Sequence, residues 1–548
     1  VTRAAELSGV RRHALDAAEQ AVLVSIHGNQ LEFRHPLVRS AVYEAATSRE
    51  RRAAHRALAE ALAEDDEHAD RRAWHLAAAT LEPDEATVQA LEEAAERAAG
   101  RGGQMAAAKA LSRAAELSVD SEARGRRLAY AARAARIAAA DEYARTLANQ
   151  ADALVDDPLL RAEIACAIGA AEVRRGRPLE GFPRLIQAAR EVASLDLQKA
   201  VEALVWANAA AFTVGNVEAL AEVSKAADEI VFLGGEDELM HVVRALGAFA
   251  RTLEGRMPGA DEREESFVWA SSSDDPELVY LVSAALGLMG DDQRFGPLLD
   301  RAVSLARARG ELGTLVQGLT ARALRHAFLQ HRFDAAARAG EESLRFAREL
   351  GAVNIATISL CVLGYVAAIR GNDEEARRHA GEALEVAEAN GIGPRVVFAL
   401  YALGMLDLGR GQWAESIERL QDVVNSREGH TLIEKWALPD LVEAAVRAGQ
   451  LGEAHEALSS FEEWAAASGP PWAQARLACC RALLADDGEL STAHFEEALQ
   501  IGVDERPFDL GRIQLLYGEH LRRKRRRKDA RVQLRAALEG FERIKAEP

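Results

Sequence analysis

The chain is poor in aromatic residues, in cysteine and in long apolar runs, and each shortage excludes a class of protein. Phe, Trp and Tyr together account for only 5% of the 548 residues. No apolar stretch approaches the ~20 residues that a membrane-spanning helix needs, so we predict no membrane partner. Four cysteines show no metal-ligand spacing and are too few for a disulfide framework; they are Cys166, Cys361, Cys479 and Cys480. This cysteine usage is typical of a reducing, cytoplasmic location.

Positive charge is also scarce. Lys and Arg total 67 against 86 Asp and Glu, which gives a net charge of −19. An acidic surface repels phosphate backbones, so the chain as a whole is predicted to bind nucleic acid poorly. One basic run, residues 522–528, interrupts this pattern without the aromatic residues that stack on bases. We interpret it as a solvated turn between two helices, with Leu521 and Val532 pointing inward, rather than as a phosphate-binding patch.

Length and alanine content indicate how such a chain folds. A sequence of 548 residues is too long for one ordinary core, because single domains seldom exceed roughly 250–300 residues. An apolar content of 49% excludes a disordered chain, and its large share of alanine favours helices. The chain is therefore either split into domains or built as a repeat array, which grows without a larger core.

A short phrase recurs along the chain at intervals of about 38 residues. It consists of a Gly or basic residue, a variable residue and, shortly afterwards, an alanine, as in residues 371–376 and 449–454. The Gly or Asn predicts a helix end in the left-handed conformation, and the alanine lets the next helix approach closely. The third positions of the copies mark the repeat at Met105, Tyr143, Pro178, Val217, Met257, Phe295, Phe333, Asp373, Trp413, Leu451, Leu490 and Arg527.

Two helical patterns lie between successive markers, for example Ala356–Ile369 and Glu374–Asn390. A single helical hairpin cannot bury its apolar face, whereas stacked hairpins can, and they form a superhelix with a concave inner wall. The period resembles that of tetratricopeptide (TPR) repeats, whose usual unit is about 34 residues. We therefore predict an all-α fold, a TPR-like helical repeat superhelix.

The first hundred residues follow a different pattern. Val22–Ile26 and Gln30–Arg34 flank His27-Gly28-Asn29, a sequence that suits a hairpin turn. Helical residues precede this hairpin, and Pro36 follows it at a favourable first helical position. This order predicts a small winged-helix remnant at residues 1–47.

Two further helical patterns, Ser48–Leu62 and Asp70–Thr80, lead into the repeat. We assign residues 48–100 to linking helices and residues 101–548 to a TPR-like α-solenoid. Because the chain starts with Val1 rather than methionine, we expect it to be a piece of a longer protein.

Four segments carry a resemblance to a known family. They are residues 33–43 (FRHPLVRSAVY), 50–59 (ERRAAHRALA), 72–77 (RAWHLA) and 511–542. These segments resemble large ATP-binding transcriptional regulators of the LuxR type, which are signalling ATPases of the STAND class. That family combines an ATPase module, a winged helix, a helical-repeat sensor and a DNA-binding helix-turn-helix. The chain has no G-x-x-x-x-G-K-[ST] loop, so the resemblance implies the sensor region without the ATPase.

The resemblance also implies a residue role and a set of partners. His35 would contact the phosphate of ATP or ADP in a full-length protein; the alternative is a histidine hydrogen-bonded at a strand–helix junction. For this chain we expect no cofactor, no metal site and no catalytic residue. A small-molecule inducer or a regulatory protein would bind the concave face, DNA would be bound only through a separate C-terminal domain, and the family picture includes homo-oligomers.

Two alternatives remain open from the sequence. One is a TPR protein-binding scaffold with no small-molecule ligand, for which a long open groove would be typical, whereas a deep apolar pocket would favour a small ligand. The other is an enzyme whose hairpins close around a pair of carboxylates. Ligand-binding residues cannot be assigned from the sequence, but the tryptophans to consider first as pocket walls are Trp206, Trp269, Trp436 and Trp472.

Overall fold

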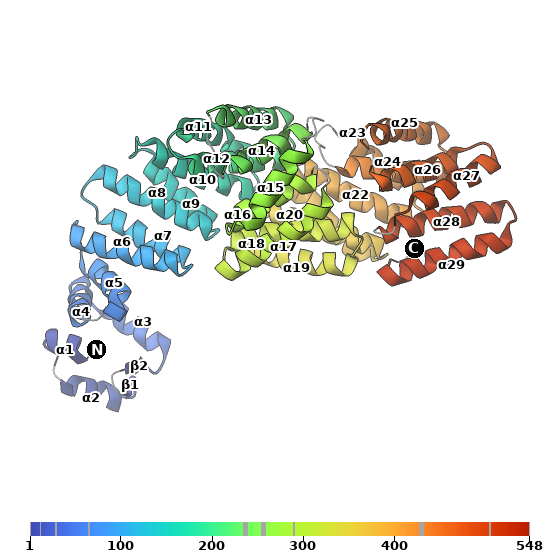
Figure 1. The fold of residues 1–548 in the computed structure, drawn as a ribbon. Helices are drawn as coiled ribbons and strands as arrows, with labels where there is room; N and C mark the ends of the chain where they lie inside the picture. The colour runs from blue at the N-terminus through green and yellow to red at the C-terminus, as the bar shows by residue number, and fades with distance from the viewer. Residues whose placement is uncertain are drawn as a thin grey trace. The chain divides into compact units, whose positions relative to one another are not determined.

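The computed structural model describes residues 2–10, 12–27, 30–63, 66–233, 239–253, 259–288, 291–426, 432–468, 470–503 and 506–546. Within these residues the secondary structure consists of 29 α-helices, a few short helical turns and one two-stranded sheet (Figure 1). The predicted all-α class is therefore confirmed. The chain divides into two compact units, Val1–Ala171 and Glu172–Pro548.

The first unit begins with the predicted β-hairpin. Its first elements are α1 (Thr2–Leu7), α2 (Arg12–Gln20), β1 (Val24–His27), β2 (Gln30–Phe33) and α3 (Pro36–Ala45). The two strands pair in antiparallel register, with Val24 opposite Phe33; His27, predicted in the turn, is instead the last residue of β1 and pairs with Gln30. The turn residues Gly28 and Asn29 lie outside the described residues. The winged-helix assignment of residues 1–47 stays a prediction.

Linking helices and alanine-rich hairpins complete the first unit. They are α4 (Ser48–Ala61), the short turn η1 (Asp66–His68), α5 (Ala69–Ala79), α6 (Glu85–Gly100), α7 (Gln104–Glu116), α8 (Ser121–Ile137), α9 (Asp141–Asp152) and α10 (Pro158–Arg175), which continues into the second unit. Thr47 and Glu50 form a capping box that starts α4. Alanines without exposed surface, such as Ala129 and Ala144, let α8 and α9 pack closely.

The second unit is a stack of helical hairpins. After the short turn η2 (Pro178–Glu180), its helices are α11 (Phe182–Val192), α12 (Leu197–Val214), α13 (Val217–Phe232), α14 (Met240–Leu253), α15 (Ala260–Ser272), α16 (Pro276–Leu288), α17 (Asp292–Arg309), α18 (Leu312–Leu324), α19 (Phe333–Glu349), α20 (Val353–Ile369), α21 (Asp373–Ala389), α22 (Gly393–Gly409), α23 (Trp413–Asn425), α24 (Leu432–Ala448), α25 (Leu451–Ser468), α26 (Pro471–Leu484), α27 (Gly488–Ile501), α28 (Pro507–Arg523) and α29 (Arg527–Ile544). Even-numbered helices are the first helices of the hairpins, and odd-numbered helices are the second.

The repeat markers fall where the second helices start. Phe333 begins α19, Asp373 begins α21 and Trp413 begins α23, and the other described markers lie at or near the same place in their hairpins. Met257 lies outside the described residues. The period of about 38 residues predicted from the sequence is therefore the length of one hairpin with its connections.

In many hairpins, the turn that connects the first helix to the second contains a residue in the left-handed backbone conformation. Glycine has this role at Gly371, Gly411 and Gly449, whose φ angles are 68°, 73° and 76°. Because glycine has no Cβ, it adopts this backbone conformation at little cost. His331 and Arg525 take the same role at φ 49° and 61°, where a side chain costs about 1–2 kcal/mol.

We expect Gly449→Ala to lower the free energy of unfolding by about 1 kcal/mol, because alanine is strained at positive φ. No atom lies within 4 Å of an added Cβ there, so the effect isolates the backbone. Gly381→Ala is the matched control, since it also meets nothing within 4 Å but lies inside α21. It should stabilise the chain by about 0.5–1 kcal/mol. Urea unfolding curves check both, and shifts in the same direction would contradict the assignment of the turn.

Hairpins five places apart touch each other in the second unit. The side-chain amide of Asn354 in α20 donates a hydrogen bond to the carbonyl oxygen of Val173 in α10. Arg506, which precedes α28, donates from Nη1 to the carbonyl oxygen of Phe328, just after α18, at 2.9 Å. Both contacts join first helices across five hairpins. One superhelical turn of this unit therefore spans five hairpins, and the first helices form its inner wall.

Candidate functional site

The first helices of seven successive hairpins line one cavity in the second unit, which we call the middle chamber. These helices are α10, α12, α14, α16, α18, α20 and α22, and no described residue of a second helix lines the cavity. The chamber has a volume of about 190 Å³. An engineered cavity of about 150 Å³ is known to hold benzene, so the middle chamber has room for a ring-sized molecule.

The walls of the middle chamber are mainly apolar. Trp206, Phe212 and Tyr280 contribute aromatic surface, and leucine, isoleucine and alanine side chains supply most of the rest. The guanidinium carbon of Arg174 lies 5.0 Å from the centroid of the Trp206 ring, which is cation–π distance. Burial raises the pKa of Tyr280 to about 12, as expected for a phenol in an environment of low polarity.

Three of the buried polar side chains in these walls have an atom that lacks a hydrogen-bond partner among the described residues. Asn208, Asn354 and Arg395 have relative exposures of 7%, 5% and 7%. Asn208 Oδ1, Asn354 Oδ1 and Arg395 Nε have no hydrogen-bond partner among the described residues. An unsatisfied buried polar group costs about 1–3 kcal/mol, so a molecule that satisfies these groups would recover that cost. Apolar walls with a few convergent polar groups are typical of small-molecule sites.

A second cluster of polar residues occupies the inner wall further along the chain. We call it the ionic core; it comprises Asp440, Arg476, Arg506, Asp509 and Arg512 around a small cavity, together with Glu443, which pairs with Arg512. Asp440 is 2% exposed and accepts hydrogen bonds from Arg476 Nη2 at 2.7 Å, from Tyr401 Oη at 2.9 Å and from Arg512. Arg512 also pairs with Glu443. The residual cavity is about 20 Å³, room for about one water molecule, so the protein's own side chains fill this part of the inner wall.

Aromatic rings close the ionic core on one side. The helix α18 continues into a π-helical turn, η3 (Arg325–Leu329), which places Phe328 against the core. The Phe328 ring stacks on Tyr365 at a centroid distance of 4.3 Å and on Trp436 at 4.9 Å. Because α18 also lines the middle chamber, η3 connects the two regions through one continuous segment. π-Helical turns are rare and are frequent at functional sites.

Electrostatics explain the protonation states in the ionic core. Burial alone would raise the pKa of Glu443, but the guanidinium groups of Arg512, Arg447 and Arg476 outweigh burial and lower it to about 2. Burial also opposes ionisation of Asp509, yet Arg506 holds its pKa well below the usual range. Both carboxylates are therefore ionised at neutral pH.

His331 lies beside the ionic core and is neutral. It is 3% exposed, and its ring lies 5.9 Å from the rings of Phe333 and Phe508. Burial, followed by the charge of Arg506, lowers its pKa to about 3. This histidine therefore contributes no charge to the core near pH 7.

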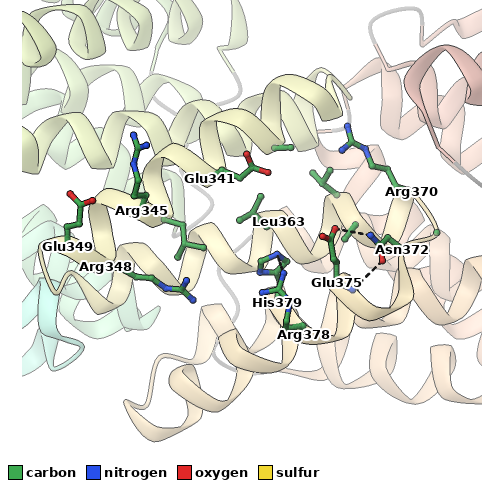
Figure 2. A pocket seen from close by; sticks show the side chains of 15 residues that line it. Glu341, Arg345, Arg348, Glu349, Leu363, Arg370, Asn372, Glu375, Arg378 and His379 are labelled. Carbon is green, nitrogen blue, oxygen red and sulfur yellow. Dashed lines mark hydrogen bonds between the residues drawn. The ribbon is translucent and has the colours of Figure 1, made fainter.

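A third hollow, the outer hollow, lies between α19, α21 and the end of α20 and has a volume of about 960 Å³ (Figure 2). Glu341, Arg345 and Arg348 line one side and Arg378 and His379 the other, so both signs of charge are present. Several of these charges already have partners, as in the 2.5 Å contact of Arg348 with Glu382. The outer hollow is wide and polar, in contrast to the middle chamber.

The structure places the sequence-predicted His35 at the start of α3. Its Nδ1 accepts a hydrogen bond from the backbone N–H of Leu37 at 3.2 Å, so it acts as the N-cap of that helix. The side chain lies on an exposed strand–helix junction, which is the geometry of the alternative considered above. The nucleotide role of His35 stays a prediction for a longer protein.

The four tryptophans considered as pocket walls lie in three different parts of the structure. Trp206 lines the middle chamber, whereas Trp436 and Trp472 line the ionic core. Trp269 instead stacks on His241, with 6.5 Å between ring centroids, in the packing of α14 and α15. The structure thus brings no two of the predicted tryptophans together in the middle chamber.

The basic run occupies the turn between α28 and α29, as predicted. Its side chains are exposed, and Arg525 makes the left-handed turn. Leu521 is buried at 1% exposure, but the prediction for Val532 is wrong, because it is 62% exposed. Val532 lies on a face of α29 that no described element covers.

Sequence reasoning missed the three polar residues of the middle chamber. Asn208, Asn354 and Arg395 each stand within a strongly apolar first helix, as in VNIATISLCVLGYVAAI for α20. A polar residue within a largely apolar helix was the available signal. The sequence did not show that residues about 190 positions apart converge on one cavity.

We also searched the described part of the chain for reactive thiols, metal-binding clusters and membrane-spanning helices. All four cysteines are buried as free thiols, and burial raises the pKa of Cys361 and Cys479 to about 12, which makes them unreactive. The described residues contain no group of three or more His, Cys, Asp or Glu side chains arranged to hold a metal. None of the described helices has both the length and the apolar character needed to cross a membrane.

Comparisons with known proteins give fold-level similarity only. No family model matches the chain, and no curated protein matches it. Among solved structures, a Rap protein complexed with competence and sporulation factor is 13% identical, with a TM-score of 0.49 over 63% of this chain and 98% of that one. The Cut9–Hcn1 structure is 12% identical, with a TM-score of 0.41 over 83% and 87% of the two chains. Yeast Tom70 is 11% identical, with a TM-score of 0.33 over 82% and 97%.

The TM-scores and identities of these structures are too low to indicate a ligand or a partner. The TPR-like repeat is defined by the hairpins themselves, which follow one another with the predicted period.

Proposed function

We propose that the chain is a non-catalytic binding region whose inner wall receives a small molecule. The observation that supports this proposal is the middle chamber, an apolar-walled cavity with three buried, unpartnered polar groups. Seven first helices meet there, so one bound molecule would contact residues from 173 to 395. A ligand that contacts so many hairpins at once can favour one arrangement of the superhelix over another, provided that it binds the two with different affinity.

The regulatory role of such binding is part of the same proposal. Residues 33–43 and 511–542 resemble LuxR-type regulators, in which a repeat region senses an inducer. In a longer protein of that kind, ligand binding at the middle chamber would be relayed to an ATPase and to a DNA-binding domain. His35 would then contact the nucleotide, as the resemblance implies.

A TPR scaffold that binds a protein is the second candidate function. The outer hollow favours it, because a volume of about 960 Å³ and charges of both signs suit a polypeptide segment better than a small apolar molecule. The ionic core argues against a peptide across the part of the inner wall that its own side chains fill, where the residual cavity is only about 20 Å³.

Filling the middle chamber tests the main proposal. We expect ring-sized fragments to bind the whole chain in ligand-observed NMR, and Ala284→Phe to weaken that binding at least tenfold by occupying the cavity. Ala337→Phe, the same change at a half-buried position of the outer hollow, is the matched control and should leave binding unchanged. The opposite pattern would place the ligand in the outer hollow and would favour the scaffold.

A further inference from the structure

Arg395 is a buried cation without a counter-ion. It is the third residue of α22, its exposure is 7%, and its side chain lines the middle chamber. Among the described residues its guanidinium has no ion pair and no hydrogen-bond partner, and Nε is completely enclosed. Other buried arginines of the inner wall differ, since Arg476 and Arg512 both pair with Asp440. A guanidinium stays protonated under all ordinary conditions, so its charge is left uncompensated.

The groups around Arg395 do not offset its positive charge. The groups that interact with it electrostatically are the phenol of Tyr280 and the thiol of Cys361, both neutral at pH 7. Among the described residues no Asp or Glu lines the middle chamber, and the second charged residue in its wall is another arginine, Arg174. Arg395 also lies in the first turn of its helix, where the backbone dipole adds positive potential. The middle chamber is therefore an apolar cavity with a positive end.

An uncompensated buried charge is costly for folding alone and useful for binding an opposite charge. The same chamber offers the amide oxygen of Asn354, whose orientation is fixed because its nitrogen donates to the Val173 carbonyl. That oxygen can only accept a hydrogen bond. A complementary ligand therefore carries an anionic group for Arg395, an apolar body for the walls and one N–H or O–H donor for Asn354.

We infer that the middle chamber binds a small organic acid, a carboxylate on a ring-sized apolar body with one hydrogen-bond donor, held by Arg395. Arginine and carboxylate form charge-assisted hydrogen bonds, which are stronger than neutral ones. The volume of about 190 Å³ limits the ligand to roughly the size of a substituted single ring. This inference rests on the proposed function and adds the chemical class of the ligand.

Calorimetric titration of the whole chain with paired probes tests the inference. The probes are ring-sized carboxylic acids, including 4-hydroxyphenylacetate, and the carboxamide of each acid. Each carboxamide has the shape of its acid without the charge. The acids should bind about 10- to 100-fold more tightly than their amides. In Arg395→Met that preference should disappear while the amides keep their affinity, and Arg395→Lys should retain part of it.

Thermal unfolding without ligand provides a readout that does not depend on the choice of probe. Arg395→Met removes an uncompensated charge, so its unfolding temperature should equal or exceed that of the unmodified chain. Arg476→Met is the control, and it should lower the unfolding temperature because it removes a partner of Asp440. A fall in Arg395→Met as large as in Arg476→Met would overturn the inference by showing that Arg395 is structurally paired.

The outcomes separate the inference from the function on which it rests. If the amides bind as tightly as the acids and Ala284→Phe abolishes both, the middle chamber is a small-molecule site but does not select an anionic ligand. That result would overturn the inference and support the proposed function. If Ala284→Phe changes the affinity of neither the acids nor the amides, the proposed function itself is wrong. Acid binding that persists in Arg395→Met would place the charge recognition elsewhere and overturn the inference.

Discussion

Replacing Asp440 with alanine is expected to destabilise the second unit by about 3–5 kcal/mol. Asp440 is 2% exposed and holds Arg476, Arg512 and Tyr401, which belong to three different first helices. Its removal takes away the carboxylate with which Arg476 forms its ion pair among the described residues, and leaves Arg512 paired with Glu443. Hydrogen exchange of α22, α24, α26 and α28 measures the loss locally, and urea unfolding measures it for the whole unit.

The control for this prediction is an exposed ion pair on the same unit. Glu342 pairs with Arg307 at 2.7 Å on second helices, where both side chains are accessible to solvent. Glu342→Gln should change the free energy of unfolding by less than about 1 kcal/mol. If Asp440→Ala behaved like Glu342→Gln, the ionic core would not be what holds these helices together.

The free energy of unfolding of the second unit should fall in two stages as the pH is lowered, because three of its buried groups each stabilise the folded state less at lower pH. His331, with its pKa lowered to about 3, is neutral in the folded chain, so protonation of the unfolded chain reduces stability from about pH 6.5 downward. Folding lowers the pKa of Glu443 from 4.5 to about 2. Its protonation therefore reduces the free energy of unfolding by about 3 kcal/mol between those two pH values. Asp509 changes stability in the same direction at still lower pH.

The free energy of unfolding measured from pH 7 to pH 2.5 checks this second prediction. Glu443→Gln should be less stable than the unmodified chain at pH 7 and should lose the steep part of the curve below pH 4.5. A flat profile down to pH 3 in the unmodified chain would contradict the ionised, arginine-paired state of Glu443.

The sequence predicted the hairpins well because their determinants are local. A glycine at positive φ, such as Gly371 or Gly411, and an alanine at a close helix contact act within a few residues of each other, so they recur with the period of the repeat. The β-hairpin and the helices predicted at 48–62 and 70–80, which the structure has at 48–61 and 69–79, depend on local determinants in the same way.

The candidate site could not be predicted in the same way. Asn354 meets Val173 across 181 residues, and Arg512 meets Asp440 across 72, so their neighbours depend on how many hairpins make one superhelical turn. That number follows from the packing angle between hairpins, which no short pattern encodes. Arg395 illustrates the consequence, because in the sequence it is an ordinary arginine after Pro394.

The contacts between hairpins five places apart change how this array is expected to respond to insertion and deletion. In an open solenoid each repeat touches only its neighbours, so repeats can be added or lost and the array can unfold from its ends. Here Asn354 with Val173, and Arg506 with Phe328, connect hairpins that are not neighbours. Removing one hairpin from within either span would misplace the contact that joins its two ends. The second unit should therefore unfold cooperatively, and natural variation in its number of hairpins should be narrow.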